Sequence, residues 1–256
     1  MTTSYVLNPL EQFEILPLLS FQAPVLGYYE LVLTNLGLFL AIQLALVITG
    51  LAVCYYPAWV ARVNTWVVFF ESLYGFLVNL ILSQLGLAGL KYFPGIFTLF
   101  LFLLVSNLLG LIPYSFTGTA HFALAIGLSC TVLIGVTYLG LAAHGLAFFR
   151  LFVPAGTPLG LVPLLVVIES ISYLARAVSL GLRLAANMLA GHVLLQLIAS
   201  FSWKFITGSL IGFLLAPVPL LLLTLLYGLE LGVAIVQAFV FVLLTASYLN
   251  DAINLH

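Results

Sequence analysis

The sequence predicts an all-α integral membrane protein. Of its 256 residues, 64% are hydrophobic and only 5% are charged, whereas about a quarter of the residues of soluble domains are charged. Several long runs contain no charge at all, and about 20 apolar residues suffice to cross a hydrocarbon core. We therefore expect about five membrane helices plus one interfacial amphipathic helix, in a single membrane domain over residues 1–256.

The first half of the chain provides three of these spans. Residues 1–30 form an N-terminal segment without the basic and apolar regions of a signal peptide. Polar residues recur near helical spacing between Asn64 and Gly86, which indicates that the interfacial amphipathic helix lies in this part of the chain. The predicted elements are a first span at 31–56, the interfacial helix at 62–89, a second span at 96–112 and a third span at 120–149.

Two much longer apolar runs follow, at residues 162–206 and 209–250, with Pro217 and Pro219 inside the second. At about 1.5 Å per residue, the first run would exceed ~60 Å as a helix, about twice the thickness of the hydrocarbon core. Such a helix must tilt, bend or break. We predict a long, steeply tilted helix hairpin.

The first long run carries three charges, Glu169, Arg176 and Arg183, placed seven residues apart. A seven-residue step is nearly two helical turns, so these side chains share almost one face. Ionisable groups deep in a bilayer cost at least ~2.5 to 3.5 kcal/mol each and are kept mainly where they pair, meet water or act on an ion. Arginine holds its proton at any cellular pH. The alternative is that Arg176 and Arg183 only form salt bridges with neighbouring helices.

The second long run carries a matching stripe, with Glu230, Gln237 and Asp251 at multiples of seven residues. If the two runs pair as a hairpin, both stripes can face a common water path or partner.

Loop charges predict the orientation. With the N-terminus outside and the C-terminus inside, Arg62, Lys91 and Arg150 fall on the inner side and only Lys204 falls outside. In that frame the titratable groups form an inner pair, Glu169 with Asp251, and an outer pair, His192 with Glu230. Arg183 lies between the two pairs.

This arrangement suits proton movement. Carboxylates and histidine bind and release protons, so two separated sets would make two half-paths from opposite sides. A permanent cation between them would repel a proton and would attract a carboxylate on a partner helix. Ser179, Asn187 and Gln237 would supply neutral hydrogen-bonding groups near Arg183, although each such group taken singly more often joins two helices.

Several other functions are disfavoured. No basic run marks a nucleic-acid site, and no nucleophile–base pair, metal cluster or phosphate loop indicates an enzyme of bond chemistry. His192 and Glu230 supply only two ligands, too few to predict a metal ion, and we expect no cofactor. A self-contained ion channel or secondary transporter remains the alternative, but such transporters often contain internal repeats, and we find none.

The sequence resembles subunit a of the rotary F-type ATP synthase in its mitochondrial form, over nearly the whole chain. The resemblance is carried by SLGLRLAANMLAGH, FVPAGTP, VPLLVVIESISYLARA, IPYSFTGTAHF, NPLEQFEI and TASYLNDAINLH. It implies a multi-pass stator subunit of the mitochondrial inner membrane, with no nucleotide-hydrolysing site of its own. The expected partners are the ring of c subunits, the peripheral stalk, other membrane-sector subunits and the lipid bilayer.

The resemblance also implies roles for individual residues. Arg183 matches the arginine that prevents a direct proton leak, and Asn187 and Gln237 match its polar neighbours. His192 and Glu230 match the half-channel on the intermembrane side, whereas Glu169, Asp251 and Tyr248 match the half-channel on the matrix side. Structural pairing and proton handling both remain open for Arg176. The transported ion would be the proton.

Overall fold

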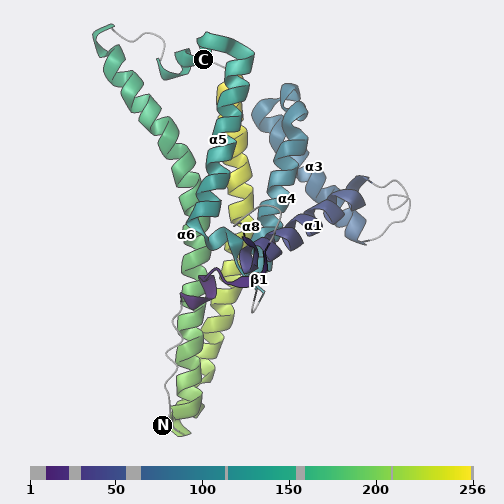
Figure 1. Cartoon of the computed structure of the whole chain (residues 1–256), viewed down its shortest axis with the longest axis vertical. Helices are drawn as coiled ribbons and strands as arrows, with labels where there is room; N and C mark the ends of the chain where they lie inside the picture. Colours follow the sequence, from purple (N-terminus) through teal and green to yellow (C-terminus); the bar gives the residue numbers. More distant parts are fainter. Residues whose placement is uncertain are drawn as a thin grey trace.

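We describe the fold from a computed structural model of the chain. The structure describes residues 10–22, 30–55, 65–112, 115–153, 159–208 and 210–254. These residues are mainly helical, as predicted. Two long helices, α6 (Val162–Gly208) and α8 (Pro217–Ile253), lie side by side in the lower half of Figure 1 and separate above. Helix α5 (Phe122–His144) packs against both.

Helix α6 is continuous over 47 residues, which corresponds to a length of about 70 Å. The sequence predicts a second run of similar length, but this run is divided into α7 (Leu210–Leu215) and α8. The division falls at Pro217, which begins α8. Proline has no backbone N–H and fits the first turn of a helix, where that donor has no partner within the helix.

Two glycines shape the contacts of α5. Helix α5 ends at His144, and the next residue, Gly145, has a φ of 56°, which glycine favours. Gly145 begins the 3-10 helix η4 (Gly145–Phe152). On α6, a Cβ added at Gly181 would lie 2.8 Å from the Ala125 carbonyl oxygen of α5. The lack of a side chain at Gly181 therefore allows α5 and α6 to approach closely.

Helix α4 (Phe93–Gly110) lies at the centre of the bundle, packed against α1 (Asn35–Tyr55), α3 (Thr65–Leu85) and α8. Large apolar side chains of α4, among them Phe97 and Leu103, are fully buried together with Phe241 and Val242 of α8. Buried polar groups also join these helices: Ser106 donates to Gln43 of α1, and Asn107 donates to the Ala234 carbonyl of α8.

An antiparallel hairpin of β1 (Pro17–Gln22) and β2 (Glu30–Thr34) precedes α1. The sequence does not predict this hairpin. The first apolar run predicts a helix from residue 31, whereas α1 begins at Asn35. Strands of five or six residues are too short to show a clear alternation of apolar and polar residues. The second strand also runs directly into α1, whose apolar run predicts a helix.

Six segments of the described residues are long and apolar enough to cross a membrane by length and composition. The sequence predicts about five plus an interfacial helix, and the sixth segment is Val67–Leu85 within α3. Its buried residues Leu77, Ile81 and Leu85 face the core, whereas the polar stripe, including Glu71, is exposed. The interfacial position of α3 remains a prediction.

The remaining short helices connect these elements. They are the 3-10 helices η1 (Glu11–Phe13), η2 (Leu87–Tyr92), η3 (Gly118–Ala120) and η5 (Leu159–Leu161). Because α4 runs antiparallel to α8 and α5 ends beside the last turn of α8, Lys91 of η2 and Arg150 of η4 lie towards the same end of the bundle. The third predicted inner charge, Arg62, lies outside the described residues.

Candidate functional site

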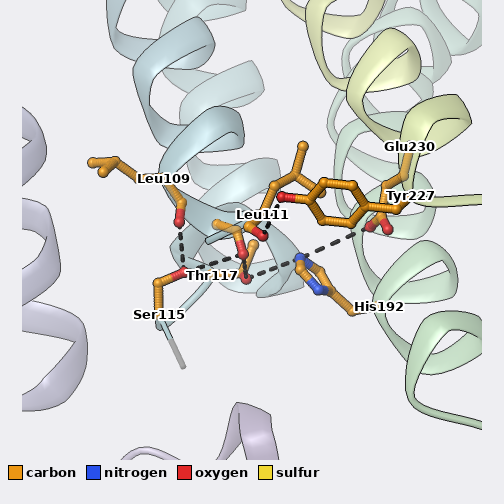
Figure 2. Close-up of polar contacts among 8 residues, drawn as sticks. Leu109, Leu111, Ser115, Thr117, His192, Tyr227 and Glu230 are labelled. Carbon is orange, nitrogen blue, oxygen red and sulfur yellow. Dashed lines mark hydrogen bonds and ion pairs between the residues drawn. The ribbon is translucent and has the colours of Figure 1, made fainter. Parts of the chain in front are cut away.

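The first cluster of ionisable groups joins the second half of α6 to the first half of α8. His192 Nε2 lies 3.9 Å from Glu230 Oε1, and the two side chains are only 13% and 6% exposed. Figure 2 shows the Glu230 carboxylate pointing towards the His192 ring. Thr117 Oγ1 lies 3.1 Å from His192 Nε2. We call Thr117, His192 and Glu230 the His192 cluster.

Neutral neighbours hold this cluster in place. A Cβ added at Gly191 would lie 2.5 Å from Glu230 Oε1, so the glycine leaves the space that the carboxylate occupies. The Thr117 hydroxyl is 3.3 Å from the Gly110 carbonyl oxygen at the end of α4. One turn before Glu230, the Tyr227 hydroxyl donates to the Leu111 carbonyl (Figure 2). Both oxygens of Glu230 are buried without a hydrogen-bond partner among the residues that the structure describes.

The second cluster lies nearer the start of α6 and the end of α8. Arg176 Nη2 is 3.3 Å from Glu169 Oε1, one heptad earlier on α6, and Arg176 Nη1 is 3.7 Å from Asp251 Oδ2 of α8. The side chain of Arg176 is 39% exposed, and those of Glu169 and Asp251 are 33% and 46% exposed. We call these three residues the Arg176 cluster. Arg176 therefore brings together the two carboxylates that the sequence assigns to one side.

Arg183 lies between the two clusters along α6. It follows Arg176 by about 10 Å of helix rise and precedes His192 by about 13 Å. The Gln237 side chain of α8 donates to the Arg183 backbone carbonyl at 3.1 Å, so Gln237 pairs with the backbone rather than with the guanidinium. The side chains of Arg183 and Asn187 are exposed, and Arg183 forms no ion pair with any residue of the described segments.

The other predicted residues lie around this axis. Tyr248 is one turn before Asp251 and within electrostatic reach of Arg176 and Arg183. Ser179 is exposed, and its hydroxyl donates to the Arg176 carbonyl of its own helix. The predicted ionic stripe thus runs along the edge of the buried face of α6, because Leu180 is buried while Arg183 is exposed.

A cavity of about 940 Å³ opens beside the His192 cluster. Its walls come from the N-terminal segment, the end of α4 with the loop that follows, and the adjoining parts of α6 and α8, and His192 is part of its lining. Near the cavity, His121 stacks on Phe116 with ring centroids 5.1 Å apart. Burial lowers the pKa of the His121 imidazole below its ordinary value, which favours the neutral ring in that stack.

The described residues contain no group of three or more His, Cys, Asp or Glu side chains that could hold a metal ion. His192 and Glu230 supply only two such side chains, and the third polar side chain beside them, Thr117, is a hydroxyl.

Sequence reasoning missed three contributors to the site. Thr117 reaches His192 from 75 positions earlier in the chain, and no local pattern reveals such a contact. Tyr227 lies three residues before Glu230, so it continues the polar stripe of α8 by one turn. Phe13, in the N-terminal segment, packs its ring against the His192 ring, with ring centroids 6.2 Å apart.

Fold and site together define a helical, multi-pass membrane protein that keeps two separated clusters of ionisable groups on one long helix hairpin. The model of the family ATP synthase A chain matches residues 37–250. Proteins called ATP synthase subunit a are similar over almost the full length. The protein of Emericella nidulans is 47% identical over 99% of this chain and 98% of its own length. That of Neurospora crassa is 49% identical over 98% and 95%, and that of the alga Chondrus crispus is 42% identical over the whole of both chains.

The chain therefore belongs to the ATP synthase A chain family. It is a component of the membrane sector of ATP synthase and not of the catalytic part of that assembly.

Proposed function

We propose that the chain is the proton-conducting stator subunit of ATP synthase in the mitochondrial inner membrane. In this proposal the His192 cluster belongs to a half-channel open to the intermembrane side, and the Arg176 cluster belongs to a half-channel open to the matrix. Protons are loaded onto and unloaded from the carboxylates of the rotating c ring. The C-terminus then lies on the matrix side and the N-terminus on the intermembrane side.

The observation that carries this proposal is the position of Arg183. It is an exposed cation on the hairpin, with one ionisable cluster on each side of it along α6. Apolar side chains are exposed around it: Val178 and Leu182 of α6 and Val236 of α8 are each at least 40% exposed. A mainly apolar surface that carries the Arg183 cation suits a membrane-embedded partner that presents a carboxylate, because the charge is then compensated across the contact.

The two clusters support the division into half-channels. They meet α8 at Glu230 and Asp251, which are about 31 Å apart in helix rise. That separation is about the thickness of a hydrocarbon core. A proton that reaches one cluster can therefore pass to the other side only by way of a carrier, which we propose to be the ring, while Arg183 repels a proton moving directly between them.

The decisive experiment replaces Arg183. In membranes that contain the assembled synthase, Arg183→Ala should abolish ATP-driven proton pumping while passive proton flow is retained, because the barrier is removed but the half-channels remain. Lys204→Ala, which removes an exposed cation from the far end of the same helix, is the matched control and should leave pumping unchanged. Normal coupled pumping in Arg183→Ala would contradict the proposal.

A second measurement excludes a self-contained channel or transporter. The purified chain alone, reconstituted into vesicles, should conduct no coupled proton current, because the carrier is the ring. Sustained transport by the isolated chain would contradict the stator function.

A further inference from the structure

We propose that the N-terminal segment, residues 10–16, forms a wall of the vestibule through which protons reach His192, and that Glu11 and Glu14 make this vestibule attractive to cations. The inference rests on the proposed function, because it concerns the source of the protons that the His192 cluster receives. It assigns a role to a part of the chain that lies outside the helix hairpin.

The vestibule is the cavity of about 940 Å³ beside the His192 cluster. Glu11, Phe13 and Glu14 line one side of it, and His192 and Tyr227 line another. Behind His192 lies Glu230, which is only 5% exposed and has no hydrogen-bond partner for either carboxylate oxygen among the described residues. A buried carboxylate of this kind needs a proton, a cation or water as its partner, and the vestibule leads to it through His192.

The N-terminal segment is fixed in place by Asn35, the first residue of α1. The Asn35 side chain donates to the Glu14 carbonyl at 2.9 Å, and its Oδ1 accepts from the Leu16 N–H at 3.2 Å. The Asn35 N–H donates to the Leu16 carbonyl at 3.1 Å. One asparagine thus ties two backbone groups of the segment with its side chain and a third with its own backbone.

Phe13 supplies the second attachment. Its ring forms T-shaped pairs with two histidines, with centroids 6.2 Å from His192 and 6.5 Å from His121. Edge-to-face pairs at such distances are favourable. The segment is therefore held by the ring contacts of Phe13 and by the hydrogen bonds of Asn35, and these contacts keep Glu11 and Glu14 over the cavity.

The charges on the lining have one sign. Glu11 and Glu14 are exposed carboxylates, and no lysine or arginine occurs among the described residues that line the cavity. A cleft lined by charge of one sign raises the local concentration of counter-ions and speeds their arrival. For this site the counter-ion is the proton, carried as hydronium or by a cationic buffer, and the attraction weakens as salt screens the two carboxylates.

The test measures the charge preference of the vestibule in the assembled synthase. In a background in which Cys54 and Cys130 of this chain are replaced, Ala199→Cys introduces a thiol on the cavity wall. Its reaction rates with a cationic and an anionic methanethiosulfonate reagent are each divided by the rate of the same reagent with a free thiol. For a separation of about one Debye length, ~10 Å at 0.1 M salt, two carboxylates should favour the cationic reagent by roughly threefold.

The acidic side chains are then removed. Glu11→Gln together with Glu14→Gln should abolish the cationic preference, whereas Glu71→Gln, which removes an exposed carboxylate from α3, should preserve it. Asn35→Ala should also reduce the preference, because the segment loses both side-chain hydrogen bonds that hold it over the cavity. A thiol at residue 199 that reacts with neither reagent, or equally with both, would overturn the proposal. A preference that survives loss of both glutamates would do the same.

These measurements are independent of proton pumping. If Arg183→Ala pumps normally, the stator function fails while the labelling result still decides whether the vestibule attracts cations. If Arg183→Ala abolishes pumping and labelling shows no charge preference, only the present inference fails.

Discussion

The His192 cluster is nearly buried and the Arg176 cluster is half-exposed, although both join α6 to α8. His192 and Glu230 are 13% and 6% exposed, whereas Arg176 and Asp251 are 39% and 46% exposed. The buried cluster contains one carboxylate and no permanent cation. The exposed cluster contains two carboxylates arranged around an arginine.

The two clusters position their titratable groups in different ways, one by packing and the other by ion pairs. Glu230 is fixed by shape, because Gly191 leaves room for it and neutral groups such as Thr117 position the histidine beside it. Glu169 and Asp251 are fixed by charge, through a cation that solvent can screen. Substitutions in the buried cluster should therefore act strongly on proton transfer, and those in the exposed cluster should act weakly.

The largest expected effect comes from Glu230→Gln. The amide keeps the size of the side chain but cannot take up and pass on a proton, and loss of a positioned acid–base group typically costs about 10²-fold or more in rate. We expect proton transport by the assembled synthase to slow by roughly that factor, with normal amounts of subunit in the complex. The measurement is ATP-driven acidification of membrane vesicles together with quantification of the assembled chain.

Glu169→Gln provides the comparison within the same chain. Because Asp251 remains beside Arg176, a second carboxylate is still available there, and the loss of rate should be smaller than for Glu230→Gln. Equal losses in the two variants would remove the distinction between the clusters.

An intermediate effect is expected for Gly191→Ala. The added methyl group would lie 2.5 Å from Glu230 Oε1 and 2.8 Å from its carboxyl carbon, so the carboxylate must move by about 1 Å. Misplacement of a reacting group by this distance can cost up to ~10²-fold, and we expect transport to slow by roughly 10-fold. Gly208→Ala is the control on the same helix, since no atom lies within 4 Å of a Cβ at that position. Unchanged transport in Gly191→Ala would show that the position of the carboxylate is not critical.

The sequence predicts the helices well because their signal is local. Runs of apolar residues identify the spans, and the seven-residue spacing of Glu169, Arg176 and Arg183 places them along one stripe of α6 whatever the helix packs against. The break at Pro217 could also have been assigned, since proline favours the first turn of a helix. The β1–β2 hairpin could not have been assigned, because the sequence signal of two short strands is weaker than that of the apolar run that follows them.

The contacts between helices cannot be predicted from local sequence patterns. That Arg176 reaches Asp251, and that Thr117 reaches His192, depends on the register and rotation of helices that are distant in sequence. A one-residue rotation turns a helical side chain by about 100°, which is enough to exchange a buried position for an exposed one, as between the exposed Ser179 and the buried Leu180 of α6. The sequence therefore places the ionisable groups along each helix but does not determine which of them is buried.

The smallest effect is expected in the Arg176 cluster and tests the comparison directly. A double-mutant cycle with Arg176→Gln and Asp251→Asn should give a coupling energy below about 1 kcal/mol, as for other solvent-exposed ion pairs. The coupling should decrease further as salt is raised, because the Debye length at 0.15 M salt is only about 8 Å. The cycle is measured on the rate of proton pumping and is compared with His192→Gln and Glu230→Gln, whose burial predicts a larger coupling that is insensitive to salt. A coupling at Arg176 as large as that at His192 would mean that another subunit or lipid shields the exposed cluster from solvent in the assembly, and the energetic difference between the two clusters would then exist only in the isolated chain.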